Sequence, residues 1–303
     1  RHRKNKYTLQ LKTEYTTLVR EVAAYRFDIA IFSYAEKHSA RLIQDAGIPY
    51  RLGPLRRSFF TRFNLWYYIN RKKSNQAEYQ LNLKMLRSLR LQNTFQFPRV
   101  NIPSLSAPSI KDRYIVIHPY KRSGTALVWP IENFQNLARY FTQQKIRVVI
   151  LGDQSDSEVL HSHFEDISLV EIRTDLSLVQ SAALIRGALH FFGNSSGPLH
   201  LAALVGTPHT GFYPQNRASS ARRWRTLPLA SAPFASQYLL NTNFPMDVQK
   251  CIGKKCKFYP CTVNISLEAA IQSTVAWKSF NKKSSKKKIQ KTTKKKVQRK
   301  NAS

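Results

Sequence analysis

The residues best suited to chemistry lie together between Gly193 and Leu201, in the run GNSSGPLHL. An apolar run precedes this segment and a helical pattern follows it, so the Ser-Ser-Gly turn is expected at the N-terminus of a helix. Backbone N–H groups at such an end have no intrahelical acceptor, and the helix dipole adds partial positive charge. The segment therefore predicts an anion site able to take a diphosphate. The residues expected to contact it are Gly193, Asn194, Ser195, Ser196, Gly197 and His200.

Individual side chains in this run suit such a site. Ser196 can donate a hydrogen bond from its hydroxyl, Gly197 lets the backbone approach a ligand closely, and Pro198 loses nothing in a first helical turn. A plain helix cap followed by a buried, hydrogen-bonded His200 explains the same pattern. Spacing alone favours that simpler interpretation, so the choice depends on the rest of the chain.

A second candidate surface lies between Arg51 and Ala77, where seven Lys or Arg residues occur without an acid and aromatic residues are interspersed with them. Phe59, Phe63 and Trp66 follow i, i+4, i+7 spacing, which predicts one face of a helix. Such a face suits the headgroup boundary of a membrane or a lipid acceptor. The residues expected in contact are Arg57, Phe59, Phe63, Trp66, Lys72 and Lys73.

Two alternatives exist for this surface. The aromatic face can pack into the core of its own domain, as it does in an ordinary amphipathic helix. Bases next to aromatic rings also suit single-stranded nucleic acid. The sequence has no aromatic RNP motif and no GXXG loop, so we expect no specific nucleic-acid partner.

The composition indicates a folded, strongly basic protein. The chain has 303 residues, a formal net charge of +32 and 42% hydrophobic residues, which is enough material for a core. No apolar run approaches the roughly 18 residues of a membrane-spanning helix. Residues 278–303 hold twelve Lys or Arg and no acid, and we expect this tail to be disordered and attracted to an anionic membrane surface.

The cysteines give a further expectation. Cys251, Cys256 and Cys261 cannot all pair with one another, which favours a reduced, cytoplasmic protein. Zinc sites usually combine closely spaced cysteine pairs with a fourth ligand, and no convincing fourth ligand lies near these three in the sequence. We therefore expect structural thiols, with no metal and no cofactor.

Strands and helices alternate along the chain, which is the pattern of a parallel sheet wrapped by helices. Prolines and serines mark a linker at 98–110. The linker separates an incomplete Rossmann-like domain at 1–97 from a second one at 111–277. The expected strands are 27–33, 50–52, 114–119, 147–152, 169–173, 189–194 and 208–213. The expected helices are 37–46, 77–89, 132–144, 178–187 and 198–205.

The segment GNSSGPLHLAALVGTPHTGFYPQN resembles the nucleotide-binding signature of glycosyltransferase family 9, the ADP-heptose:lipopolysaccharide heptosyltransferases. Further pieces are similar to family segments in the same order, namely FDIAIFSYAEKHSARLIQDAGIPYRLG, IVIHPYKRSGTALVWPIENFQNL, RVVILGDQSDSE and CIGKKCKFYPCTVNISLEAAI. The resemblance covers most of the chain outside its two ends.

The resemblance implies an α/β fold of GT-B type, in which two Rossmann-like domains face each other across a cleft. It implies inverting, metal-independent transfer of a heptose from ADP-heptose, or a related nucleotide-sugar, to the lipopolysaccharide inner core. The C-terminal domain would bind the nucleotide-sugar. The N-terminal domain would bind the lipopolysaccharide core acceptor, at the cytoplasmic face of the inner membrane. The alternatives are a non-catalytic relative that binds sugar-nucleotide or lipopolysaccharide, and a basic nucleic-acid-binding protein.

The sequence departs from the family pattern in three places. Ser195 stands where the family has Asp, and Leu127 or Val128 stands where the family has a Lys before its Trp-Pro pair. Lys121 or Arg122, in the same loop, can substitute as a contact to the diphosphate; the alternative is that both are simply exposed bases. The family's opening strand and catalytic base would precede the first residue. We therefore assign no catalytic base and expect the chain as given to bind the donor with little turnover.

Overall fold

The computed structural model of the chain describes residues 14–71, 74–91, 110, 112–120, 127–217, 219–227, 236–239, 255–256 and 260–274. The chain separates into two compact units, residues 1–95 and 96–303. Each unit holds its own parallel sheet, which confirms the predicted α/β class. The domain boundaries given above stay predictions. The basic tail, the linker apart from Ile110, and Lys72, Lys73, Lys121, Arg122 and Cys251 lie outside the described residues.

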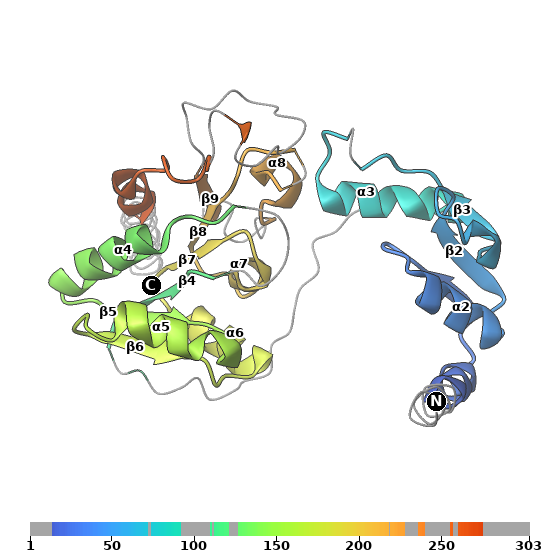
Figure 1. The fold of residues 1–303 in the computed structure, drawn as a ribbon, viewed down its shortest axis with the longest axis horizontal. Helices are drawn as coiled ribbons and strands as arrows, with labels where there is room; N and C mark the ends of the chain where they lie inside the picture. The colour runs from blue at the N-terminus through green and yellow to red at the C-terminus, as the bar shows by residue number, and fades with distance from the viewer. Residues whose placement is uncertain are drawn as a thin grey trace, which may run out of the picture. The chain divides into compact units, whose positions relative to one another are not determined.

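The second unit is built on a six-stranded sheet with the order β6-β5-β4-β7-β8-β9, in which every neighbouring pair is parallel (Figure 1). The strands are β4 (Tyr114–His118), β5 (Arg147–Leu151), β6 (Val170–Arg173), β7 (Phe191–Asn194), β8 (His209–Phe212) and β9 (Ser236–Leu239). The predicted strands of this unit are confirmed, and β9 is an addition. The chain runs outward through β5 and β6 and then returns to place β7 on the other side of β4.

Helices cover both faces of this sheet because its strands are apolar on both sides. Ile115 and Ile117 of β4 join a core beneath α4 (Ile131–Gln143), α5 (Ser157–Phe164) and a helix at 267–274. Tyr114 and Val116 point the other way and join a core beneath α6, α7 and α8. The bounds of these three helices are Leu178–Gly187, Gly197–Leu204 and Ala221–Trp224, and a 3-10 turn, η3, spans Gln154–Asp156.

The first unit holds a three-stranded parallel sheet in the order β1-β2-β3. Its strands are β1 (Ile29–Ile31), β2 (Tyr50–Pro54) and β3 (Leu65–Tyr67). Its other elements are a helix at 14–24, α2 (Lys37–Asp45), α3 (Glu78–Met85) and the 3-10 turns η1 (Phe60–Arg62) and η2 (Leu86–Leu89). The α2 helix stops before Gly47, whose φ of +74° is a backbone conformation that glycine adopts without strain.

The predicted helical face of Phe59, Phe63 and Trp66 is wrong. The segment forms η1 and then β3, so the three rings do not share a helix face. Phe63 turns into the core and packs over Gly53, where a Cβ atom would lie 2.4 Å from the ring. The Trp66 side chain is exposed, and its indole N–H donates to the carbonyl of Phe60 over 3.1 Å.

Among the residues that the structure describes, no helix has both the length and the apolar character needed to cross a bilayer.

Candidate functional site

The turn between β7 and α7 lies where the sequence places it. Ser196 is the N-cap residue of α7, and Pro198 occupies the first turn. The N–H of Ser195 donates to the carbonyl of Phe212 on β8 over 3.2 Å, so this donor belongs to the sheet rather than to a ligand. The N–H groups of Gly197 and Leu199 have no acceptor within the helix, as expected for a first helical turn. They are the backbone donors available to an anion.

Asn194 holds the site together from within the core. Its side chain is buried, accepts a hydrogen bond from the N–H of Trp129 at 2.8 Å and donates to the carbonyl of Pro119 at 2.6 Å. One amide therefore fixes both ends of the segment between β4 and α4. Gly193 is required by packing, because a Cβ atom there would lie 2.9 Å from the ring of Phe191. Both residues position the loop and leave ligand contact to their neighbours.

A pocket of about 400 Å³ opens beside the N-terminus of α7. Its walls come from the carboxyl ends of β4 and β5 and from the first turns of α6 and α7. The lining residues are His118, Tyr120, Leu151, Gly152, Asp153, Asp156, Leu176, Leu178, Ser181, Ser196, Gly197, Pro198 and Leu201. The pocket lies where the strand order reverses between β4 and β7. Open parallel sheets bind their ligands at such a switch point.

Two polar atoms at this pocket are shielded from solvent and have no hydrogen-bond partner among the described residues. They are the hydroxyl oxygen of Ser196 and Nδ1 of His118. Buried polar atoms without a partner are uncommon and need an explanation. Because both side chains line the pocket, the simplest explanation is a polar ligand that forms hydrogen bonds with them.

The lining residues of the pocket differ in chemistry. Leu176 and Leu178 supply apolar wall, and Leu178 is one of the most exposed apolar side chains described. Asp153 and Asp156 supply carboxylates, which can accept hydrogen bonds from hydroxyl groups. The Asp153 carboxylate also accepts from the N–H of Ser155 at 3.2 Å, which fixes its direction. The pocket therefore combines an anion end, acceptors for hydroxyls and an apolar surface.

Both histidines of the site are held in the neutral form. Burial lowers the pKa of His118 to about 4 despite the opposing effect of Asp156, and burial also lowers the pKa of His200. Near neutral pH each ring can therefore donate one hydrogen bond but brings no positive charge. His200 sits on the first turn of α7 but is not one of the lining residues.

The predicted diphosphate contacts thus fall into three groups. Ser196 and Gly197 line the pocket, whereas Gly193, Asn194, Ser195 and His200 lie beside it. Lys121 and Arg122 are outside the described residues. Four further lining residues were not predicted from the sequence: His118, Tyr120, Asp153 and Asp156. Each follows or ends a strand at its carboxyl end, and that position is the signal that could have identified them.

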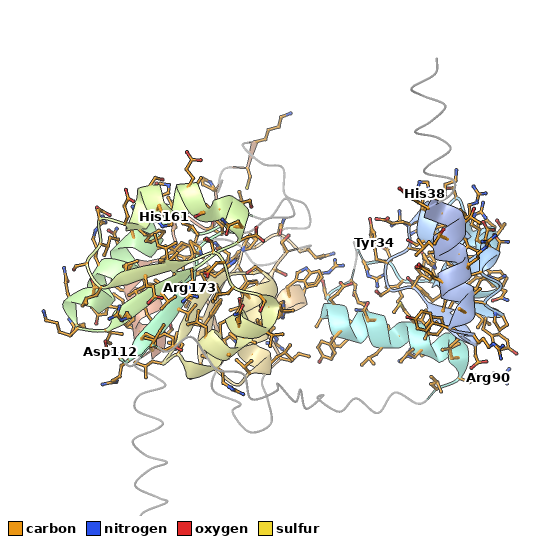
Figure 2. The ribbon with its side chains drawn as sticks, turned by 90° about the horizontal axis from the view of Figure 1, so that it is seen from below. Tyr34, His38, Arg90, Asp112, His161 and Arg173 are labelled. Atoms are coloured by element: carbon orange, nitrogen blue, oxygen red, sulfur yellow. The ribbon has the colours of Figure 1, made fainter. Side chains whose placement is uncertain are left out.

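The basic surface of the first unit also gathers at the carboxyl ends of its strands. The Arg57 guanidinium lies 5.7 Å from the ring centre of Tyr34, which follows β1, and that of Arg56 lies 5.1 Å from the ring of Tyr68, which follows β3 (Figure 2 labels Tyr34). Cation–π pairs of this kind hold the guanidinium planes in place without neutralising them. Phe59 is half-buried and Phe63 buried.

Cys256 is a free thiol, and Cys261 is buried. Within the described ranges, no three His, Cys, Asp or Glu side chains come together as a metal site would require.

Comparisons with known proteins agree with this geometry. The model of "Glycosyltransferase family 9 (heptosyltransferase)" matches residues 15–261. A Haemophilus influenzae protein provisionally named a glycosyltransferase is 24% identical over 237 residues, which cover 71% of this chain and 68% of that protein. The solved structure of E. coli ADP-heptose LPS heptosyltransferase II superposes with a TM-score of 0.62 and 18% identity, over 87% of this chain and 80% of that one. The structure of E. coli heptosyltransferase WaaC with ADP superposes with a TM-score of 0.58 and 17% identity, over 78% of this chain and 73% of that one.

Proposed function

The chain belongs to glycosyltransferase family 9, and from that premise we propose that it transfers a heptose from ADP-heptose, or a related nucleotide-sugar, to the lipopolysaccharide inner core. The family assignment rests on residues 15–261, and the GT-B-like fold rests on a structural similarity that covers 87% of the chain. The donor and acceptor are the finer part of the proposal. They are supported by the heptosyltransferase description of the family and by the E. coli relatives.

One observation supports the donor site. The pocket at the α7 N-terminus contains two buried polar atoms without a hydrogen-bond partner among the described residues, the Ser196 hydroxyl and His118 Nδ1. In the proposed complex the diphosphate lies against Ser196, Gly197 and the backbone donors of α7. Lys121 and Arg122 approach it from the loop after β4. The ribose hydroxyls meet the two aspartates, and the base packs on Leu176 and Leu178.

In the proposed reaction an acceptor hydroxyl oxygen attacks the anomeric carbon of the heptose. The bond from that carbon to the β-phosphate oxygen breaks, and ADP leaves with the electron pair. The hydroxyl proton passes to a base that we do not assign. The α7 N-terminus and the Ser196 hydroxyl stabilise the charge that builds on the departing diphosphate, which is the main catalytic contribution of this unit. We expect inversion at the anomeric carbon and no requirement for a metal.

The acceptor side rests on the first unit. Arg57, with Arg56, presents a fixed positive charge at the carboxyl ends of the strands, and Phe59 and Trp66 add partly exposed aromatic surface. This combination suits an anionic glycolipid at the cytoplasmic surface of the inner membrane. Lys72 and Lys73 complete the proposed contact set. Phe63 leaves it, because its ring is buried.

A second candidate function is binding of a nucleotide-sugar without transfer. It is favoured by Ser195, which replaces the family's Asp and is buried with its N–H committed to the sheet. Transfer of radiolabelled heptose onto heptose-deficient lipopolysaccharide distinguishes the two functions.

The donor site itself is tested by Gly197→Val. A Cβ atom at Gly197 meets no heavy atom within 4 Å, so the protein should fold normally. The added side chain enters the space proposed for the diphosphate. We expect the affinity for ADP, measured by calorimetry, to fall by more than about tenfold, as for a loss of one or two charge-assisted hydrogen bonds.

Gln143→Val, at the exposed end of α4, is the matched control and should bind ADP normally. If Gly197→Val and the control bind ADP with equal affinity, the proposal that the anion site lies at the N-terminus of α7 is wrong.

A further inference from the structure

The pocket proposed for the donor has an imbalance of charge. Its lining includes Asp153 and Asp156 but no lysine or arginine among the described residues. A nucleoside diphosphate adds at least two negative charges. Neutral donors alone compensate such a group incompletely when it is partly removed from water. A cation from just beyond the described lining would complete this compensation.

The candidates are few, because the ligand lies at the carboxyl edge of the sheet. The relevant positions are the carboxyl ends of the strands and the loops that lead from them to the next helix. Among the described residues of this unit, these positions hold only two arginines, Arg173 and Arg217, and no lysine. Arg173, at the end of β6, donates to Asp175 at 3.0 Å and to Glu171 at 3.3 Å (Figure 2 labels Arg173). Its charge is already balanced by two carboxylates.

Arg217 is in a different situation. Its Nε atom is shielded from solvent and has no hydrogen-bond partner in the described part of the chain. No carboxylate forms an ion pair with it among the residues that the structure covers. A guanidinium with a buried, unused N–H is costly to keep, and an incoming anion would use that donor.

The topology places the loop that carries Arg217 next to the loop that carries Ser196. β7 and β8 are parallel neighbours with Asn194 opposite Phe212. The loop that holds Ser196 and the loop that holds Arg217 therefore leave the sheet side by side. In the loop after β8, the side chain of Asn216 is buried and accepts a hydrogen bond from the N–H of Ser219 at 3.1 Å.

We infer that Arg217 is a further cation that contacts the diphosphate of the donor, from the loop after β8. This inference rests on the proposed function. Arg217 would supply the positive charge that the family pattern places before the Trp-Pro pair and that Leu127 and Val128 cannot supply. The guanidinium would approach the leaving group from the β8 side, opposite the wall formed by His118 and Asp156.

The test compares ADP with adenosine by calorimetry, in the full chain. Removing a charge-assisted hydrogen bond to the diphosphate should weaken ADP binding by about 10- to 100-fold. Adenosine lacks the diphosphate, so Arg217→Met should leave its affinity unchanged. Arg217→Lys, which keeps the charge but loses the planar fork, should fall between wild type and Arg217→Met.

Two controls make the result specific. Arg186→Met removes an exposed arginine at the C-terminal end of α6, away from the pocket, and should change neither affinity. The double variant Lys121→Met with Arg122→Met removes the other proposed cations and should weaken ADP binding less than Arg217→Met does.

Equal weakening of ADP and adenosine by Arg217→Met would mean that the residue only supports the fold, and would overturn the inference. So would unchanged ADP affinity in Arg217→Met. If Gly197→Val abolishes ADP binding while Arg217→Met does not, the inference fails and the proposed function survives. If Gly197→Val also binds ADP normally, the proposed donor site fails as well.

Discussion

The two units share the same alternation of strands and helices, but their strands are buried to different extents. In the second unit helices cover both faces, and β4, β5, β7 and β8 are buried almost throughout. In the first unit Ile31 lies beside Leu52 in the register, yet it is 43% exposed whereas Leu52 is fully buried. The comparison shows that a shared pattern of strands and helices does not imply a shared depth of burial. A deep core can hold a preorganised pocket, and a shallow sheet presents exposed cations.

A pair of asparagines repeats this contrast on a smaller scale. Asn64 accepts from the N–H of Arg51 at 2.8 Å and donates to the carbonyl of Pro49 at 2.7 Å. Asn194 makes the same two kinds of bond to Trp129 and Pro119. Asn64 is exposed and Asn194 is buried. Water can replace the first pair of bonds but not the second.

The largest expected effect comes from Trp129→Ala. The indole stacks on Phe212 at 4.0 Å, meets Phe134 edge-on at 4.8 Å and donates to the carbonyl of Ile265. Truncation should cost about 3–5 kcal/mol of unfolding free energy. Hydrogen exchange followed by mass spectrometry should show faster exchange in the second unit only. Equal acceleration in the first unit would mean that the two units unfold together.

The next effect is a pH dependence confined to the second unit. Burial lowers the pKa of His209 to about 4, below the ordinary value of 6.5. Between these values the unfolded chain binds the proton more readily than the folded one. Stability present above about pH 6.5 is therefore lost as the pH falls towards 4, by roughly 3 kcal/mol for this residue.

Urea unfolding between pH 7.5 and 4.5 measures this loss, and His209→Gln should flatten the curve. His118 contributes a loss of the same sign, because its pKa is also about 4. His38, the one histidine in the described part of the first unit, is exposed (Figure 2). A matching pH dependence of hydrogen exchange in the first unit would contradict the attribution of the stability loss to the buried histidines of the second unit.

The smallest effect separates the two asparagines. Asn194→Ala leaves two buried backbone groups without partners and should cost about 2–3 kcal/mol, whereas Asn64→Ala should cost about 0.5–1 kcal/mol. Chemical unfolding of both variants, followed by exchange within each unit, gives the difference. Similar costs would mean that the first unit is as well sealed as the second.

Sequence periodicity predicted the second unit well, because its elements carry strong local signals. The apolar run RVVIL became β5, and the helical spacing of Phe134, Leu137 and Phe141 became the buried face of α4. The position of the anion turn was also predictable, since Ser-Ser-Gly-Pro after an apolar run fixes a helix start.

Two features could not be predicted from local sequence. The spacing of Phe59, Phe63 and Trp66 fits a helix, but it fits a 3-10 turn followed by a strand equally well. The choice depended on Gly53, whose missing side chain leaves room for the Phe63 ring. The pocket joins residues from several strand ends, and their convergence follows from the strand order rather than from any one motif.

The Asn194 clamp has a consequence for how this protein can change. One buried side chain hydrogen-bonds to both Pro119 and Trp129, so the two ends of the connection from β4 to α4 are held together. Doubling the length of a closed loop costs only about 0.6 kcal/mol of chain entropy. Insertions and new side chains in this segment should therefore be tolerated without disturbing the sheet. Tyr120 of this segment lines the donor pocket, so variation here can change what the pocket binds while the sheet stays intact.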